Sequence, residues 1–131
     1  MPALASLPAP ACVSILFVDD EPLMLQAFAR VVGSECPHWE VVTASGVDEA
    51  KQVLARRRFS ALVSDLVMPG PNGVALLAYA REHHPTMLRV VYSGVVEDFA
   101  KDREIRRADL VFAKPALATE IVSELERLLG P

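Results

Sequence analysis

Five short apolar runs, each followed by a segment with helical spacing, constrain the fold of this chain more than any other feature. The runs are rich in Val, Ile, Leu and Phe, and they lie at 13–18, 39–44, 61–65, 88–92 and 110–113, with 39–44 giving the weaker strand signal. Continuous apolar runs of this length are typical of strands that are buried on both faces. Their alternation with helices indicates βαβ units and a mostly parallel sheet that is covered on both sides. The sequence therefore predicts an α/β fold with five strands and five helices.

Apolar residues at helical spacing predict helices at 22–33, 48–59, 74–84 and from 117 to near the C-terminus, and 95–107 is expected to form a polar, weakly patterned helix. Pro22 suits a first helical turn, and Gly33 and Pro37 are expected to end the first helix. The predicted apolar stripes are Leu25, Phe28, Ala29 and Val32; Val47, Ala50, Val53 and Leu54; Val74, Leu77 and Ala78; and Leu117, Ile121, Leu125 and Leu128. The basic run Arg56–Arg58 is interpreted as the solvated C-terminus of the second helix.

Length and composition favour one domain with a substantial core. The chain has 131 residues, of which 52% are hydrophobic, and its net charge of −4 argues against direct binding of nucleic acid. Cys12 and Cys36 form neither a disulfide framework nor a metal-ligand pattern. Residues 1–12 are rich in Pro and Ala and contain neither a signal peptide nor a membrane span. We therefore expect a disordered tail at 1–12, a domain at 13–131 and a cytoplasmic location.

Chemically capable side chains follow four of the five apolar runs. Asp19 and Asp20 follow the first run, Asp65 ends the third, Ser93 follows the fourth and Lys114 follows the fifth. Each one alone would fit an ordinary loop or turn residue. However, the carboxyl ends of parallel strands share one edge of the sheet, so we expect these side chains to meet in one crevice.

Three carboxylates in one crevice repel one another, by roughly 4 kcal/mol for a pair about 4 Å apart at an effective dielectric constant near 20. A lysine and a divalent cation would relieve this repulsion, and an all-oxygen ligand set is typical of Mg²⁺. A hard cation beside a free carboxylate and an amine suits a phosphoryl group, which the carboxylate would attack in line.

With these residues in this order, the chain resembles the receiver domain of response regulators of bacterial two-component systems. The matching segments are Ile15–Glu21, Ser64-Asp65 followed by Met68-Pro69 and Gly73, Ser93-Gly94, and Lys114-Pro115. The resemblance implies a flavodoxin-like (βα)5 three-layer sandwich, with a five-stranded parallel sheet in the order 2-1-3-4-5.

The resemblance also implies a role for each site residue. Asp65 would accept a phosphoryl group from a sensor histidine kinase or a histidine phosphotransfer protein. Asp19, Asp20 and Asp65 would bind Mg²⁺ together with the backbone carbonyl of Val67, while Ser93 and Lys114 would contact the acyl phosphate. In the family, the Lys-Pro bond that corresponds to Lys114–Pro115 is commonly cis. Such a domain is a signalling module that promotes only its own phosphorylation and slow dephosphorylation.

Three positions depart from the family pattern. Val111 stands where the family usually has an aromatic residue that relays the signal, and strand alternation points the neighbouring Phe112 to the opposite face. Val67 and Val95 are apolar at positions that tune dephosphorylation, which predicts slow hydrolysis of the acyl phosphate. Gly70-Pro71 is expected to stiffen the loop after Asp65.

In the family, the face formed by the fourth helix, the fifth strand and the fifth helix transmits the signal. Here this face is expected to include Phe99, Lys101, Arg103 and Arg106. An output domain, a target protein or a second copy of the chain in a homodimer could dock there, with no membrane involved. No output domain follows in this sequence, so we expect either a stand-alone receiver or one part of a longer regulator.

Two other functional classes remain open. A degenerate receiver would bind a partner constitutively without phosphorylation, which the absent aromatic residue at Val111 favours and the complete acidic set disfavours. An aspartate-nucleophile phosphatase would need a spaced Asp-x-Asp motif on its first strand, whereas Asp19 and Asp20 are adjacent. Flavin binding is disfavoured because the first loop is acidic and would repel an anionic cofactor.

Overall fold

The computed structural model describes Leu7, Pro10 and residues 12–67, 73–94, 102–114 and 118–130. Its strands form one parallel five-stranded sheet in the order β2-β1-β3-β4-β5, as predicted. The strands are β1 (Ser14–Val18), β2 (Glu40–Ala44), β3 (Ala61–Asp65), β4 (Leu88–Ser93) and β5 (Leu110–Ala113). The helices are α1 (Pro22–Glu35), α2 (Val47–Leu54), α3 (Gly73–His83), α4 (Arg103–Arg106) and α5 (Ala118–Leu129).

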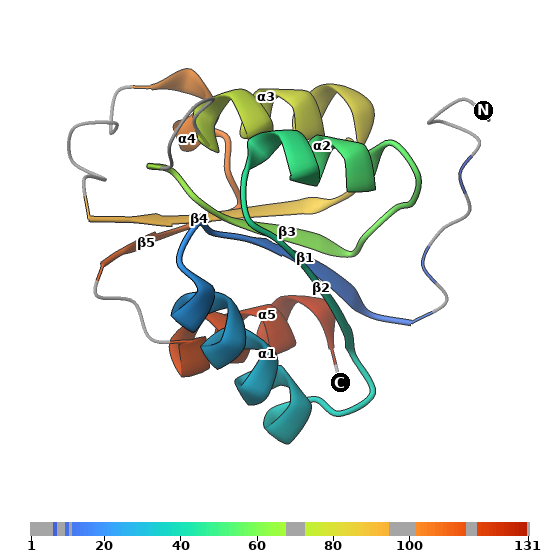
Figure 1. The fold of residues 1–131 in the computed structure, drawn as a ribbon. Coiled ribbons are helices and arrows are strands. Elements are labelled where there is room, and N and C mark those ends of the chain that lie inside the picture. Colours follow the sequence, from blue (N-terminus) through green and yellow to red (C-terminus); the bar gives the residue numbers. More distant parts are fainter. Residues whose placement is uncertain are drawn as a thin grey trace.

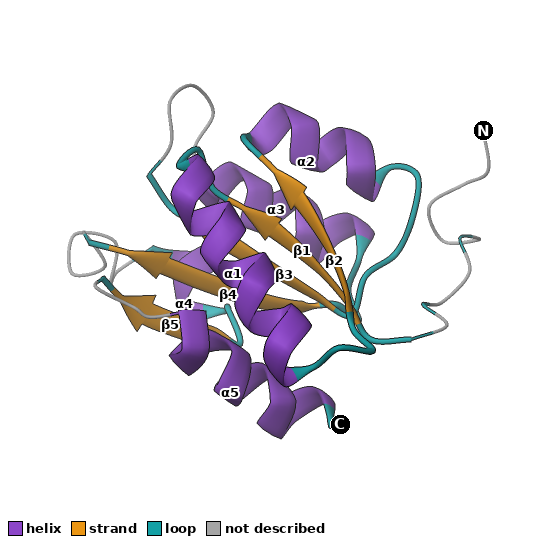
Figure 2. Cartoon of the chain, turned by 60° about the horizontal axis from the view of Figure 1, so that its bottom comes forward, coloured by secondary structure: helices purple, strands orange, loops and turns teal. Residues whose placement is uncertain are grey.

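Helices cover both faces of the sheet (Figure 1). α1 and α5 pack together on one face, while α2, α3 and α4 lie on the other. β1 and β3 are buried along their whole length, which explains why they read as continuous apolar runs in the sequence. Figure 2 shows the strands running in one direction, so their carboxyl ends share one edge.

Each face of the sheet carries its own apolar core, because side chains alternate along a strand. Phe17 and Val63 face α1 and α5, whereas Leu16 and Leu62 face α2 and α3. A third, smaller cluster around Val91 and Ile105 packs under α3 and α4. The two main cores hold the sheet rigidly between its helices and so fix the positions of the strand ends.

Several helix boundaries differ from the prediction. α1 continues through Gly33 to Glu35, and the backbone N–H of Cys36 completes its last turn on the Val32 carbonyl (2.7 Å). Gly33 is exposed, and a Cβ added there would meet nothing within 4 Å. Ala29 is exposed rather than part of the buried stripe.

α2 ends at Leu54 instead of Phe59, and the basic run lies beyond the helix rather than at its end. Arg57 pairs with Glu40 at the start of β2, and Arg58 donates to Thr86 at 2.9 Å. Phe59 is buried before β3 begins. The segment after α2 thus makes contacts with residues that are distant in sequence. The local spacing of apolar residues does not predict these contacts.

Smaller differences concern the other elements. β2 begins at Glu40, so Trp39 precedes it, and α3 begins at Gly73 and ends at His83. Ala78 is only partly buried, and Leu128 is 41% exposed instead of completing the α5 stripe. The predicted helix at 95–107 is described only from Asp102, and residues 95–101 and Leu117 lie outside the described residues. The same holds for most of the expected tail at 1–12, within which Leu7 is buried.

α4 is short and is held in place by a buried arginine from the sheet. Arg89 of β4 donates to the Leu77 carbonyl of α3 (3.2 Å), to the Arg107 carbonyl (2.8 Å) and to the Glu104 carboxylate (3.4 Å). Arg81 of α3 also pairs with Glu104 at 2.9 Å. Asp102 caps the helix by accepting from the backbone N–H of Glu104 at 2.8 Å. These contacts join α3, α4 and β4 in one polar network.

No helix in the described ranges of the chain has both the length and the apolar character that a membrane span requires.

Gly73→Ala is expected to lower the free energy of unfolding by about 1–3 kcal/mol, because the site has no room for a methyl group. A Cβ at this position would lie 2.4 Å from the Asp65 carbonyl oxygen and 2.8 Å from the Leu66 Cα. Gly33→Ala is the matched control and is expected to stabilise by about 0.5–1 kcal/mol, because Gly33 is inside a helix with open space around it. Urea unfolding of both variants checks this, and equal effects of the two substitutions would contradict it.

Candidate metal and phosphoryl site

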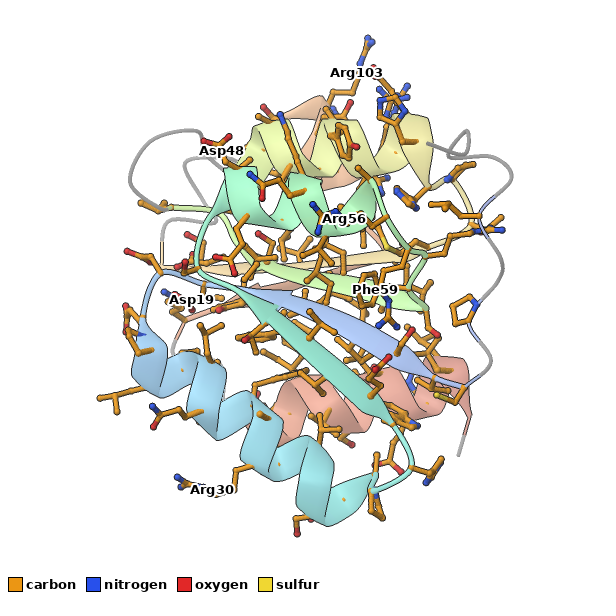
Figure 3. The ribbon with its side chains drawn as sticks, turned by 45° about the vertical axis from the view of Figure 1, so that its right-hand side comes forward. Asp19, Arg30, Asp48, Arg56, Phe59 and Arg103 are labelled. Carbon is orange, nitrogen blue, oxygen red and sulfur yellow. The ribbon has the colours of Figure 1, made fainter. Side chains whose placement is uncertain are left out.

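The strand register places two acids and a tyrosine side by side at the carboxyl edge of the sheet. Val18 of β1 pairs with Ser64 of β3, so Asp19 stands next to Asp65, and Asp65 in turn pairs with Tyr92 of β4. Residues in register on neighbouring parallel strands point to the same face. Asp19, Asp65 and Tyr92 therefore form a row across β1, β3 and β4, and Figure 3 shows Asp19 at the edge where α1 begins.

Asp19, Asp20 and Asp65 form the acidic cluster that the sequence predicts. One carboxylate oxygen from each lies within 4.8 Å of the others, with Asp19 and Asp65 buried and Asp20 exposed. Carboxylate oxygens at this separation fit a hard divalent cation such as Mg²⁺, which also retains several waters. Asp20 leaves the cluster exposed to solvent on one side.

Asp19 is anchored through both of its carboxylate oxygens. Oδ1 accepts from the backbone N–H of Glu21 at 2.9 Å, and Oδ2 accepts from the hydroxyl of Tyr92. Burial raises the pKa of the Asp19 carboxyl, and the neighbouring Asp65 adds to this, while the two hydrogen bonds and Lys114 act against it. Holding Asp19 ionised in this place therefore costs folding free energy.

Lys114 supplies a positive charge beside Asp65. Its Nζ lies 3.0 Å from Asp65 Oδ2, and its backbone N–H donates to the Ser93 carbonyl at 3.0 Å. Burial by itself would lower the pKa of Lys114, but the hydrogen bond and charge of Asp65 outweigh it and leave that pKa raised. The amine is therefore protonated at neutral pH and neutralises part of the acidic cluster.

Asp65 is held from its own chain as well. Its Oδ1 accepts from the backbone N–H of Val67 at 3.2 Å, and its backbone carbonyl accepts from the Ser64 hydroxyl at 2.9 Å. Gly73 at the start of α3 packs directly against this carbonyl. Ser93 lies at the end of β4 and is buried. Val67 is 52% exposed.

The sequence predicted the members of this site but missed Tyr92, which it assigned only to a strand. Burial raises the pKa of the Tyr92 phenol, and the hydrogen bond to Asp19 adds to the shift, so the hydroxyl stays protonated and donates. The one sequence signal for this role was the polar hydroxyl of Tyr92, which directly precedes Ser93.

Val111 on β5 departs from the family pattern, and the side chains alternate between the two faces of the sheet there as predicted. Val111 is 41% exposed, whereas Phe112 packs against the core under α1 and α5. The described residues do not include Val95, the Gly70-Pro71 loop or Pro115. The same holds for Phe99 and Lys101 on the expected signalling face.

Comparison with known proteins agrees with this geometry. The family model described as response regulator receiver domain matches residues 15–126. The chain belongs to the response regulator receiver domain family. This confirms the resemblance that the sequence motifs indicated.

Curated relatives of this receiver domain include transcriptional regulators. The hydrogenase transcriptional regulatory protein HoxA of Cupriavidus necator is 37% identical over 84 residues, which cover 64% of this chain and 17% of that protein. The probable transcriptional regulatory protein TcrX of Mycobacterium tuberculosis is 29% identical over 119 residues, which cover 89% of this chain and 50% of that protein. The receiver domain thus spans half or less of the length of these two relatives.

Solved structures share the fold of this receiver domain at low sequence identity. The response regulator TrrA of Thermotoga maritima, solved in complex with Mg²⁺-BeF, has a TM-score of 0.78 at 22% identity and covers 88% of this chain and 98% of that one. A CheY-like receiver domain protein from Methanospirillum hungatei has a TM-score of 0.79 at 21% identity, with coverage of 91% and 94%. Both confirm the flavodoxin-like architecture.

Asp19→Asn is expected to raise the free energy of unfolding of the metal-free domain at neutral pH. The native state binds the Asp19 proton more tightly than the unfolded chain does, so stability falls as pH rises from 3.8 through the raised pKa. The gain from Asn should therefore be complete above that window and absent below it.

Urea unfolding in a chelator over a series of pH values checks this prediction. Asp48→Asn is the control, because Asp48 is an exposed acid at the start of α2 outside the cluster. An Asp19→Asn variant no more stable than the parent at pH 7 would contradict the argument.

Proposed function

We propose that this receiver domain accepts a phosphoryl group on Asp65 from a phosphohistidine of a sensor histidine kinase or a histidine phosphotransfer protein. The observation that carries the proposal is the charge arrangement around Asp65. Its carboxylate lies 3.0 Å from the Lys114 amine and within 4.8 Å of two further acids. A scaffold that only binds a partner has no need for three carboxylates in mutual repulsion, whereas phosphoryl transfer has a use for each of them.

The position of the Asp65 carboxylate beside Lys114 supports a direct transfer. One of its carboxylate oxygens forms the new bond to phosphorus while the bond from phosphorus to the histidine nitrogen breaks and its electron pair returns to the imidazole. Lys114 stabilises the negative charge on the phosphoryl oxygens and on the acyl phosphate. Ser93 at the adjacent strand end donates its hydroxyl hydrogen bond to the same group.

Asp19, Asp20, Asp65 and the backbone carbonyl of Val67 would hold the Mg²⁺ ion. The ion would supply positive charge for the oxygens of the transferred group. Asp19 is already fixed by two hydrogen bonds and needs little reorganisation, and Asp20 is exposed and free to adjust its rotamer. The donor set consists of oxygens alone, as Mg²⁺ prefers.

The phosphorylated domain would signal through the face formed by α4, β5 and α5, by shifting an equilibrium between two arrangements of that face. Arg103, Arg106 and Val111 are exposed there, and Figure 3 shows Arg103 extending from α4 away from the sheet. The partner would be an output domain, a target protein or a second copy of the chain. The proposal includes neither direct contact with nucleic acid nor a membrane location. It assigns the domain to the cytoplasm.

A second candidate function rests on Val111. Without the usual aromatic residue on β5, a degenerate receiver could bind a partner constitutively and remain unphosphorylated. The exposed Val111 and the inward Phe112 favour this alternative. Phosphorylation of Asp65 separates the two functions directly.

Incubation with acetyl phosphate and Mg²⁺ is expected to add the mass of one phosphoryl group, and Asp65→Asn should abolish the gain because the nucleophile is lost. Asp48→Asn, which removes an exposed acid outside the cluster, should retain it. Intact-protein mass spectrometry makes the measurement. No gain in the parent protein with any phosphodonor would overturn the proposal and support the constitutive module.

The acyl phosphate is expected to hydrolyse slowly, because Val67 offers no polar group to orient an attacking water. Val67→Glu should shorten the half-life several-fold, since this half-exposed side chain belongs to the loop that contacts Asp65. Val111→Glu changes an exposed valine on β5 and should leave the half-life unchanged. Loss of the phosphoryl mass with time, after removal of the donor, measures both, and a fast-hydrolysing parent protein would refute the prediction.

A further inference from the structure

Tyr92 reaches from β4 across β3 to a metal-binding acid on β1. Its hydroxyl donates to Asp19 Oδ2, although β4 and β1 are not neighbours in the sheet. Two strand spacings separate the two backbones, roughly 10 Å. A tyrosine that lies across the intervening strand spans this gap, whereas an aliphatic side chain would not.

Packing fixes the ring of Tyr92. It is fully buried and stacks on Phe17, with the centroids 5.7 Å apart and the planes at 17°. Phe17 in turn stacks on Phe28 of α1 at 4.0 Å. The Lys114 amine lies 5.3 Å from the centre of the Tyr92 ring. The hydroxyl therefore has one well-defined place, set by the core beneath it and the lysine beside it.

The main chain of Tyr92 is tied to the same site. Its carbonyl accepts from the backbone N–H of Leu66 at 3.2 Å, directly after Asp65. Its successor Ser93 accepts from the backbone N–H of Lys114 at 3.0 Å. A shift of Tyr92 would therefore displace Asp19 through the side-chain hydrogen bond. It would also displace the strand ends at Asp65 and Lys114 through the backbone hydrogen bonds.

We propose that Tyr92 is a positioning residue that holds the Asp19 carboxylate in the orientation that Mg²⁺ requires. Oδ1 is set by the Glu21 N–H and Oδ2 by the phenol, so the carboxylate cannot rotate. An ionised carboxylate offers about four lone-pair sites, so two remain for an ion after these two hydrogen bonds. This inference rests on the proposed function, because it concerns the metal of that same site.

The competing explanation is that Tyr92 only fills the core. Tyr92→Phe separates the two, because it keeps the ring and its stacking on Phe17 and removes only the hydroxyl. The chain offers a matched control in Tyr79, its one other tyrosine. Tyr79 lies on α3, where its ring contacts His83 and Lys51 away from the acidic cluster.

Calorimetric titration with Mg²⁺ provides the first test. Tyr92→Phe is expected to raise the dissociation constant for Mg²⁺ about tenfold, within the range seen when a hydrogen-bond partner of a metal ligand is removed. Tyr79→Phe should bind Mg²⁺ like the parent protein. Equal or tighter binding by Tyr92→Phe would overturn the inference while leaving the proposed function intact, and no Mg²⁺ binding by the parent would overturn both.

Tyrosine absorbance provides a second readout, because it reports whether Mg²⁺ binding changes the surroundings of the Tyr92 phenol. Addition of Mg²⁺ should perturb the near-ultraviolet tyrosine spectrum of Tyr79→Phe, in which Tyr92 is the sole tyrosine. The perturbation should be absent from Tyr92→Phe. If Tyr92→Phe does not fold, the Tyr79→Phe spectrum still decides the question, and an unchanged spectrum at saturating Mg²⁺ would overturn the inference.

The dependence of phosphorylation on Mg²⁺ completes the test. With acetyl phosphate as donor, Tyr92→Phe should be phosphorylated on Asp65 more slowly than the parent at low Mg²⁺ and at nearly the same rate at saturating Mg²⁺. A rate that stays low at all Mg²⁺ concentrations would overturn the positioning role, because it would show that the defect lies outside metal binding.

Discussion

The mutual repulsion of three carboxylates at one edge of the sheet is the constraint to which the rest of the site is fitted. Asp19 and Asp65 are buried, so water screens their charges poorly. The structure compensates with the Lys114 amine on Asp65, the phenol of Tyr92 and the Glu21 N–H on Asp19, and the Val67 N–H on Asp65. The negative charge that these groups leave uncompensated would attract a divalent cation, and the same charge accounts for the cost of keeping Asp19 ionised.

The aromatic residues of the site are arranged differently from the family pattern that the sequence resembles. Val111 on β5 is exposed and aliphatic, while Tyr92 on β4 is buried and reaches the acidic cluster. Through Phe17 and Phe28, Tyr92 connects the cluster with α1 on the face opposite α4. The polar network of Arg89, Glu104 and Arg81 holds α4 on the other side. An aromatic stack therefore connects the site with α1 on one face, whereas on the other face a polar network holds α4.

Strand positions could be predicted from sequence more closely than helix ends. β3 matches its predicted bounds because a strand buried on both faces must be apolar throughout, and this pattern is local. α2 ends five residues early, and the residues after it make contacts that are distant in sequence, Arg57 with Glu40 and Arg58 with Thr86. α1 runs past Gly33 because that glycine is exposed and the helix is held by Phe28 and Val32 on its buried side.

The sequence by itself determined which residues stand at the strand ends, because each apolar run stops at a visible polar residue and parallel strands share one carboxyl edge. It therefore determined the acidic cluster with Lys114. Only the tertiary structure decided that Tyr92 bonds to Asp19, a contact between residues 73 positions apart. The physical reason is that side-chain alternation is readable along one strand, whereas the register between strands and the reach of a side chain across a neighbour arise only when the sheet is assembled.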